Sequence, residues 1–259
     1  MDAGIITPGK IDDRPIQQLS VRDLRGYDCV HFFAGIAGWE FALQLANYRG
    51  PFPVWTGSCP CQPFSLLSKE DQPFDADNHL WPSWFSLINR ARPAIIFGEQ
   101  VNNAIEWGWL DLVCDDLGGA GYSYGSSVLP ACSVGAFHIR YRLYFMGYTN
   151  GARLERQSGD GYGWAQSRRN RTNETGSITT ASDAAKPWRA VDWLASKDGK
   201  RRPTKPGLFP LAYGVSQRVG KLRAIGNAIV PQLGAEFIKA SIEAMYDDVG
   251  QHQKRAKKA

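Results

Sequence analysis

Cys61 stands in a short proline-rich stretch whose residue types suit a nucleophile. Ser58–Ser65 reads Ser-Cys-Pro-Cys-Gln-Pro-Phe-Ser and follows an apolar run that is typical of a buried strand. Pro60 and Pro63 flank the cysteine and stiffen the loop. A thiol that follows a strand at the open edge of an α/β sheet is well placed to attack a bound substrate. The alternative is a buried structural thiol, and a metal site with Cys59 is not indicated because no nearby cysteine or histidine completes it.

One carboxylate and two arginines could act beside that thiol. Glu99 follows the apolar run at 94–97, so a strand would carry it to the crevice at the sheet edge. Arg140 and Arg142 are two residues apart, which places both on one face of an extended chain. Guanidinium groups bind phosphates and carbonyl oxygens well. Taken singly, a surface glutamate and a pair of surface salt bridges explain these residues equally.

Two glycine-containing segments are candidates for binding a ligand. Phe33–Gly38, with the sequence Phe-Ala-Gly-Ile-Ala-Gly, ends a predicted strand and opens a predicted helix. Glycines at such a turn let a ligand approach the backbone amides of the helix N-terminus, although they are often only structural. Gly226 and Asn227 precede the last predicted helix, where Asn227 could simply act as the cap.

Alternating strands and helices are expected to position these residues. Apolar patterns predict strands at 29–34, 54–57, 94–97, 122–128 and 142–147, and helices at 15–26, 39–48, 79–89, 110–117 and 231–246. This alternation predicts an α/β domain with a mostly parallel sheet. Between 150 and 204 the pattern fails, because Gly, Ser, Thr, Asn and Arg dominate, and we expect an irregular segment that is either functional or disordered.

Charge is distributed unevenly along the 259 residues. Residues 1–150 carry 10 Lys/Arg and 15 Asp/Glu, whereas residues 151–210 carry 12 and 6. Such asymmetry suits a polyanionic partner. With 43% hydrophobic residues the chain can form a core, and it has no run of about 18 apolar residues that would cross a membrane. Five cysteines and no signal peptide at the N-terminus predict a reduced, cytoplasmic protein.

The order of these motifs resembles that of the DNA (cytosine-5) methyltransferases, particularly short phage and prophage members. The family's cofactor loop is similar to His31–Gly38, and its proline-cysteine-glutamine motif to Pro60–Gln62. Its glutamate-asparagine-valine motif is similar to Glu99–Val101, its paired-arginine motif to His138–Arg142, and its final motif to Gly226 and Asn227. The resemblance covers residues 28–147 and 215–245. It implies a Rossmann-like class I methyltransferase sheet with a small irregular target-recognition region.

The resemblance also implies a domain organisation. The catalytic α/β domain would comprise residues 1–149 and 211–250, the second part bearing the closing helix. Between them, residues 150–210 would form a small basic target-recognition region, and residues 251–259 would be a basic tail. The partner implied is double-stranded DNA, in a DNA-modification or restriction-modification setting in a bacterial or phage-infected cell.

The resemblance further implies a mechanism in which Cys61 adds to C6 of a flipped cytosine. Glu99 would hold N3, and Arg140 and Arg142 would bind the O2 side. The methyl donor would be S-adenosylmethionine, and no metal is implied. Positions matching the cofactor's surroundings are Phe33, Ala34, Gly35, Ile36, Gly38, Pro60, Leu80, Asn227 and Ile229. Expected DNA contacts are Gln62, Ser65, Lys200, Arg201, Arg202 and Lys205.

The sequence departs from the family between the first two motifs. Only residues 39–59 separate Gly38 from Pro60, and a further strand–helix–strand unit of ~30 residues does not fit there. In the family that unit carries the acidic residues for the cofactor's ribose and adenine, yet no Asp or Glu occurs between Glu40 and Glu70. His31, Ala37, Gln100 and His138 are smaller changes within the motifs.

Several hypotheses therefore remain open. The chain could use S-adenosylmethionine with other groups or a partner protein completing the pocket. It could instead take a one-carbon unit from 5,10-methylenetetrahydrofolate and form hydroxymethylcytosine, or be a DNA-binding homologue without activity. A redox enzyme using Cys59 and Cys61 is an alternative of a different class, and an RNA substrate also stays open.

Overall fold

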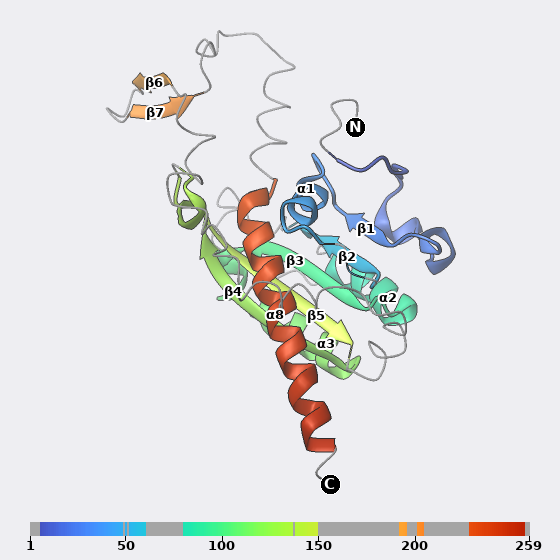
Figure 1. Ribbon diagram of the computed structural model, residues 1–259. Coiled ribbons are helices and arrows are strands. Elements are labelled where there is room, and N and C mark those ends of the chain that lie inside the picture. Colours follow the sequence, from blue (N-terminus) through green and yellow to red (C-terminus); the bar gives the residue numbers. More distant parts are fainter. Residues whose placement is uncertain are drawn as a thin grey trace.

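A five-stranded mixed sheet forms the centre of the computed structural model (Figure 1). The structure describes residues 6–48, 50, 52–60, 80–136, 138–149, 192–195, 201–204 and 228–256, with backbone only at 192–195, 201–204 and 248–256. The strand order is β1-β2-β3-β5-β4. The strands are β1 (Cys29–Phe32), β2 (Val54–Gly57), β3 (Ile95–Val101), β4 (Tyr122–Pro130) and β5 (Tyr141–Thr149). β1, β2 and β3 are parallel, whereas β5 is antiparallel to both β3 and β4.

Helices cover both faces of this sheet. α1 (Gly38–Leu45) and α8 (Pro231–Ala256) share one core, in which Trp39 and Phe237 pack on Phe97. α2 (Trp81–Ala91) and α3 (Trp109–Gly119) cover the opposite face, where Trp81 and Trp109 pack edge-on against Phe145. In Figure 1 the last turns of α8 extend well beyond the sheet. The expected α/β class is confirmed.

β3 is buried on both faces, as expected for a central strand flanked by parallel and antiparallel neighbours. Ile95 and Phe97 face the α1–α8 core, and Ile96 faces the opposite core. Gly98 lies opposite Phe145 in the register, and the Phe145 ring occupies the space where a Cβ at position 98 would lie. A glycine is therefore required there, and the strand continues through it to Val101.

The structure corrects several expectations. The strand predicted at 94–97 extends to Val101, so Glu99 and Gln100 lie within it rather than after it. The sheet is not mostly parallel, since two of its four strand pairs are antiparallel. The reason is that only residues 131–140 join β4 to β5, and this is too short for a crossover between parallel strands.

Three further differences concern the N-terminus, the basic segment and the last helix. Residues 15–26 form two 3-10 turns, η1 (Ile16–Gln18) and η2 (Val21–Leu24), because Ser20 and Asp23 form a capping box that starts a new turn. The segment expected to be irregular contains a separate antiparallel pair, β6 (Asp192–Ala195) and β7 (Arg201–Thr204). α8 extends ten residues beyond the predicted end at Tyr246.

The shortened sheet expected from the spacing of the motifs is confirmed. β1 pairs directly with β2 and is the terminal strand of the sheet among the residues described. Ile16, Leu19 and Leu24 from the N-terminal turns pack into the core that also contains Phe32 of β1, and both turns contact α2. The N-terminal segment therefore covers apolar surface that a further strand–helix–strand unit would otherwise bury.

We expect Gly98→Ala to destabilise the fold by about 1–3 kcal/mol, because the added methyl overlaps the buried Phe145 ring. Gly125→Ala is the matched control, since a Cβ at that position on β4 meets nothing within 4 Å. Urea denaturation of both variants would measure the difference. Equal midpoints for the two variants would contradict the packing described here.

Candidate active site

A buried carboxylate lies at the end of the sheet where β1, β2 and β3 finish. Arg142 Nε donates to Glu99 Oε1 over 3.1 Å, from the neighbouring antiparallel strand. The Glu99 side chain is only 7% exposed and that of Arg142 is 23% exposed. The structure thus brings together two of the residues that the sequence predicts to be catalytic, with the arginine closer to solvent.

Burial and hydrogen bonding act on Glu99 in opposite directions. Desolvation raises the pKa of Glu99 above its usual value, and this is the largest effect. The charge of Arg142, a hydrogen bond from the Ser58 side chain and the charge of Arg140 all lower the pKa. A carboxyl group in such surroundings holds its proton to higher pH than a free carboxyl group does.

Arg140 connects this edge to the segment before α8. Its Nη2 donates to the carbonyl oxygen of Ala228 over 3.0 Å. Arg140 adopts φ +37°, in the left-handed region that side chains other than glycine rarely adopt. Strained backbone of this kind is concentrated at functional sites. Burial and the neighbouring Arg142 lower the pKa of Arg140.

The segment that leads to Cys61 is anchored at two successive residues. Trp39 Nε1 donates to Ser58 Oγ over 3.1 Å, and Gln100 Nε2 donates to the Cys59 carbonyl oxygen over 3.2 Å. Gln100 also accepts the Val101 amide, which fixes its orientation. Cys61, Gln62 and Ser65 lie outside the described residues. The described chain ends at Pro60, which is exposed and one residue before Cys61.

Cys59 is not suited to be a nucleophile. It is 4% exposed, and burial raises the pKa of its thiol to about 12. A thiol in this state is neutral at physiological pH and hence unreactive. This speaks against the redox hypothesis, which needs both Cys59 and Cys61.

The glycine loop is largely exposed and has the left-handed backbone conformations expected of a tight ligand-binding turn. Phe33, Gly35 and Ala37 all have positive φ, of 53°, 53° and 63°. A Cβ at Gly35 would meet nothing within 4 Å, so there is room above the loop, and Ala34 and Ile36 are exposed. At Gly38 a Cβ would lie 2.9 Å from the Ile229 side chain.

Of the residues predicted to surround a cofactor, the structure therefore brings Gly38 and Ile229 into contact. Leu80 is also close to the Pro-Cys segment, since its backbone forms a hydrogen bond with the Cys59 thiol. Asn227 lies outside the described residues, as do Lys200 and Lys205. Arg201 and Arg202 belong to β7, of which only the backbone is described.

A polar network beside the glycine loop was not predicted from the sequence. His31 is within hydrogen-bonding distance of Thr56 Oγ1 at 2.8 Å and of Glu40 Oε2 at 3.1 Å. Glu40 also accepts from Gln44 and from the Thr7 amide, and the bond with His31 is the largest effect that lowers its pKa to about 2. The one local sequence pattern that indicates part of this network is the four-residue spacing of Glu40 and Gln44, which places both side chains on one face of a helix.

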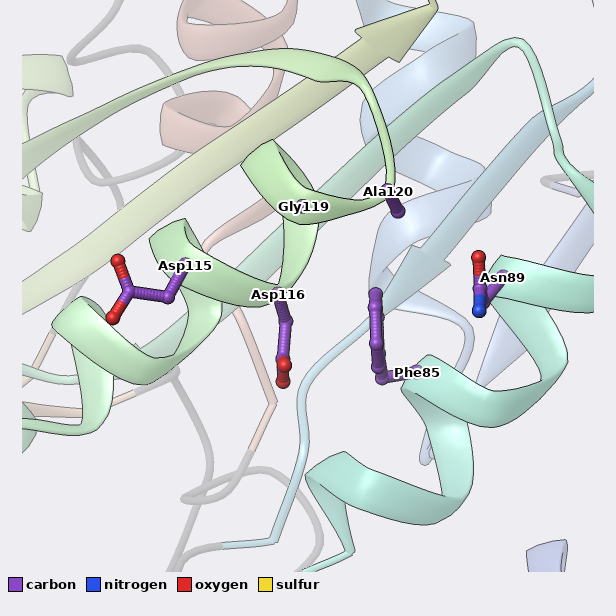
Figure 2. A pocket seen from close by; sticks show the side chains of 6 residues that line it. All are labelled: Phe85, Asn89, Asp115, Asp116, Gly119 and Ala120. Carbon is purple, nitrogen blue, oxygen red and sulfur yellow. The ribbon is translucent and has the colours of Figure 1, made fainter.

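A shallow hollow of about 220 Å³ lies between α2 and α3 (Figure 2). It is lined by Phe85, Asn89, Asp115, Asp116, Gly119 and Ala120. Phe85 and Asn89 belong to α2, and the others lie in the last turns of α3 or, for Ala120, directly after it; the two helices lead into the amino ends of β3 and β4. The hollow is therefore at the end of the sheet opposite Glu99, and Asp116 already accepts the Trp81 indole N–H over 2.7 Å.

Comparison with known proteins identifies the family. A model of the C-5 cytosine-specific DNA methylase family matches residues 44–198, which is more than half of the chain. The chain belongs to this family. The matched range contains Pro60–Gln62, Glu99 and both arginines, whereas the glycine loop and the Gly226–Asn227 motif lie outside it.

Individual relatives of this methylase family are distant. The type II methyltransferase M.AluI of Cellulosimicrobium cellulans is 26% identical over 112 residues, which are 39% of this chain and 22% of that protein. The chain thus spans about a fifth of this relative's length.

Among solved structures, a DNMT2 variant of Spodoptera frugiperda aligns with a TM-score of 0.39 and 16% identity, over 47% of this chain and 49% of that chain. A DNA modification methyltransferase encoded within an Escherichia coli prophage aligns with a TM-score of 0.37 and 16% identity, over 49% and 47%. In the described part of the chain, no helix is both long and apolar enough to cross a membrane.

Removing Arg142 should destabilise the protein more at high pH than at low pH. A carboxyl whose pKa is raised on folding makes the folded state bind more protons, so stability falls as pH rises above about 4.5. Arg142→Ala raises the pKa of Glu99 further and leaves a buried carboxylate unpaired, at a cost on the order of 3 kcal/mol near pH 8.

Urea denaturation at pH 5 and pH 8 measures this effect. Arg25→Ala, an exposed arginine after η2, is the control and should lose no stability at either pH. In the double variant Glu99→Gln with Arg142→Ala the pH dependence should disappear. An equal loss at both pH values in Arg142→Ala alone would mean that the ion pair is not responsible.

Proposed function

We propose that this chain methylates C5 of cytosine in double-stranded DNA with S-adenosylmethionine as the donor. The observation that carries the proposal is the buried Glu99–Arg142 pair at the edge to which Ser58–Pro60 leads the chain before Cys61. A nucleophilic thiol, a carboxyl that can hold a proton and a guanidinium then come from three segments to one edge. Membership of the C-5 cytosine-specific DNA methylase family supports this reaction.

Cytosine C5 is a poor nucleophile until C6 is attacked. The Cys61 thiolate forms a bond to C6, and Glu99 gives its proton to N3 as charge develops there. Arg142 and Arg140 stabilise the O2 side of the ring. The enamine carbon C5 takes the methyl group, and its proton then passes to water. The electrons of that C–H bond restore the C5–C6 double bond, Cys61 leaves as thiolate, and N3 returns its proton to Glu99.

The glycine loop fits the approach of a cofactor to the backbone. The open space at Gly35 and the contact of Gly38 with Ile229 would place a ligand between the loop and the segment before α8. Phe33, Ala34, Ile36, Pro60, Leu80 and Asn227 are the further residues that would hold it. When bound, S-adenosylmethionine supplies an electrophilic methyl group.

The DNA partner requires that the target base leaves the duplex, because C6 is inaccessible within the stack. Residues 150–210 would read the target, with Lys200, Arg201, Arg202 and Lys205 on phosphates and Gln62 and Ser65 near the flipped base. The catalytic domain would comprise residues 1–149 and 211–250, followed by a basic tail at 251–259. We place this activity in the cytoplasm of a bacterial or phage-infected cell.

Hydroxymethylation with 5,10-methylenetetrahydrofolate is the second candidate. The observation in its favour is the terminal position of β1, beyond which the described residues supply no further strand to carry a ribose-binding carboxylate. Glu40, the acidic side chain after the glycine loop, is already bonded to His31, Gln44 and Thr7. The thiol, Glu99 and the arginines would activate C5 equally for either donor. A partner protein that completes the adenosine pocket is the remaining variant of the first candidate.

Product analysis decides between the donors. The purified protein is incubated with cytosine-containing duplex DNA and either S-adenosylmethionine or methylenetetrahydrofolate, and digested nucleosides are identified by mass spectrometry. We expect 5-methylcytosine only with the first donor and none with Cys61→Ala, while Cys132→Ala, an exposed cysteine away from the motif, keeps full activity.

A covalent trap tests the nucleophile separately. In DNA that contains 5-fluorocytosine the last step is blocked, because fluorine cannot leave C5 as a proton does, and Cys61 should stay bonded to C6 in a complex that resists denaturant. Formation of 5-hydroxymethylcytosine with the folate alone would contradict methylation and support the second candidate, hydroxymethylation. No product and no adduct, despite tight DNA binding, would contradict both.

A further inference from the structure

Ser58 links the nucleophile segment to the buried carboxylate, a role that neither the family match nor the motifs assign to it. It is the first residue after β2 and lies three residues before Cys61. Its hydroxyl is hydrogen-bonded to two groups, the Trp39 indole at 3.1 Å and the Glu99 carboxylate. Trp39 is 2% exposed and held by the aromatic rings of Phe97 and Tyr144, so its indole N–H is fixed in position.

The direction of these two hydrogen bonds follows from the chemistry of the groups. An indole nitrogen can only donate, so the Ser58 oxygen accepts from Trp39. An ionised carboxylate can only accept, so the single hydroxyl proton of Ser58 is directed to Glu99. The order of donation is therefore fixed from Trp39 through Ser58 to Glu99.

Arg142, on the other side of Glu99, is also only a donor. When Glu99 binds a proton, Arg142 still offers only donors, and the Trp39 indole already occupies one of the two lone pairs of the Ser58 oxygen. Among the described neighbours of Glu99, only the second lone pair of Ser58 then competes for the acid proton with an acceptor on the substrate. In the proposed reaction that acceptor is N3 of the target cytosine.

We propose that Ser58 is a positioning residue, which Trp39 orients so that Glu99 directs its acid proton at the substrate. This inference rests on the proposed function for the identity of the acceptor, but the arrangement of Trp39, Ser58 and Glu99 can be tested without any substrate. Ser58 also couples the nucleophile segment to the acid, because the residue that contacts Glu99 belongs to the strand end from which Cys61 follows.

The groups that face Glu99 determine how it titrates when Ser58 is removed. Among the described residues these groups are Ser58 after β2, Arg142 and Tyr144 on β5, and Arg140 before β5. Burial raises the pKa of Tyr144, so this phenol remains neutral, and the two arginines carry positive charge throughout. Loss of the Ser58 hydroxyl removes a bond that favours the ionised carboxylate, and the pKa of Glu99 should rise.

The first experiment measures the Glu99 carboxyl directly in the protein without DNA or cofactor. The chain has eight glutamates, and ¹³C labelling at their carboxyl carbons followed by NMR at successive pH values resolves each titration, with Glu99→Gln identifying the signal. Ser58→Ala should move the midpoint to higher pH, and Ser58→Thr, which keeps a hydroxyl, should restore it. Ser126→Ala, an exposed serine on β4, is the matched control.

Trp39→Phe tests the orienting bond. It removes the indole donor and keeps an aromatic ring, so the Ser58 hydroxyl is free to turn and the Glu99 midpoint should move in the same direction as in Ser58→Ala. Because Trp39 is a core residue, near-ultraviolet circular dichroism must first show that the variant is folded. Trp107→Phe, at an exposed tryptophan, controls for the spectroscopic change.

The second experiment measures methylation as a function of pH. Ser58→Ala should lower kcat about tenfold with little change in KM for DNA, because proton transfer is misdirected while binding is kept. Its alkaline limb should lie at higher pH than that of the wild type, since Glu99 keeps its proton longer. Ser58→Thr should recover both.

The two experiments separate the inference from the proposed function. An unchanged Glu99 midpoint in folded Ser58→Ala would overturn the inference even if the wild type methylates DNA. A shifted midpoint in a wild type that modifies no cytosine would uphold the arrangement at Glu99 and reject the proposed function alone. A fall in kcat that Ser58→Thr does not restore would also overturn the inference, because it would indicate a packing effect.

Discussion

The arrangement of the active edge depends on a carboxylate that is held almost out of water. The ionised form of Glu99 is accessible at this buried strand end only because donors surround it, since an unpaired buried charge is costly. The main donor, Arg142, comes from β5, which is inserted antiparallel between β3 and β4. The mixed topology is therefore not incidental, because the antiparallel direction brings the start of β5 to the carboxyl end of β3.

The opposite edge of the sheet is formed by β1, and the described residues contain no further strand–helix–strand unit beyond it. On one face of this edge, Ile16, Leu19 and Leu24 of the N-terminal turns belong to the core that also contains Phe32 of β1. On the other face His31 pairs with Glu40, which in turn binds Thr7. A negative charge is thus kept beside the glycine loop, but it comes from the helix after the loop and is already hydrogen-bonded to the histidine.

The sequence correctly predicted the strands and helices whose positions depend on local apolar patterns. β2 was placed at Val54–Gly57, and the helices at 39–48, 79–89 and 110–117 were found within a few residues, because apolar periodicity reports which residues are buried. The strand predicted at 94–97 stops short of Gly98 because the reason for that glycine is tertiary: the Phe145 ring fills the space where its Cβ would lie. The contacts of Ser58 with Trp39 and Glu99 join residues 19 and 41 positions apart, and no spacing rule indicates them. Pairing of β6 with β7 was not predicted because each strand has only four residues and neither alternates between apolar and polar positions.

Segments that are far apart in the sequence close the site through backbone groups as well as side chains. Arg140 donates to the carbonyl of Ala228, and one residue later Ile229 contacts Gly38 of the first glycine loop. Residues 228–229 thus connect the arginine motif to the loop after β1, and α8 follows at Pro231 to fix them against α1. A change in the position of α8 would therefore alter both the contact of Ile229 with the glycine loop and the hydrogen bond of Arg140 with Ala228. The chain after the basic segment is therefore a structural part of the edge at which Glu99 lies, and not an appendage to it.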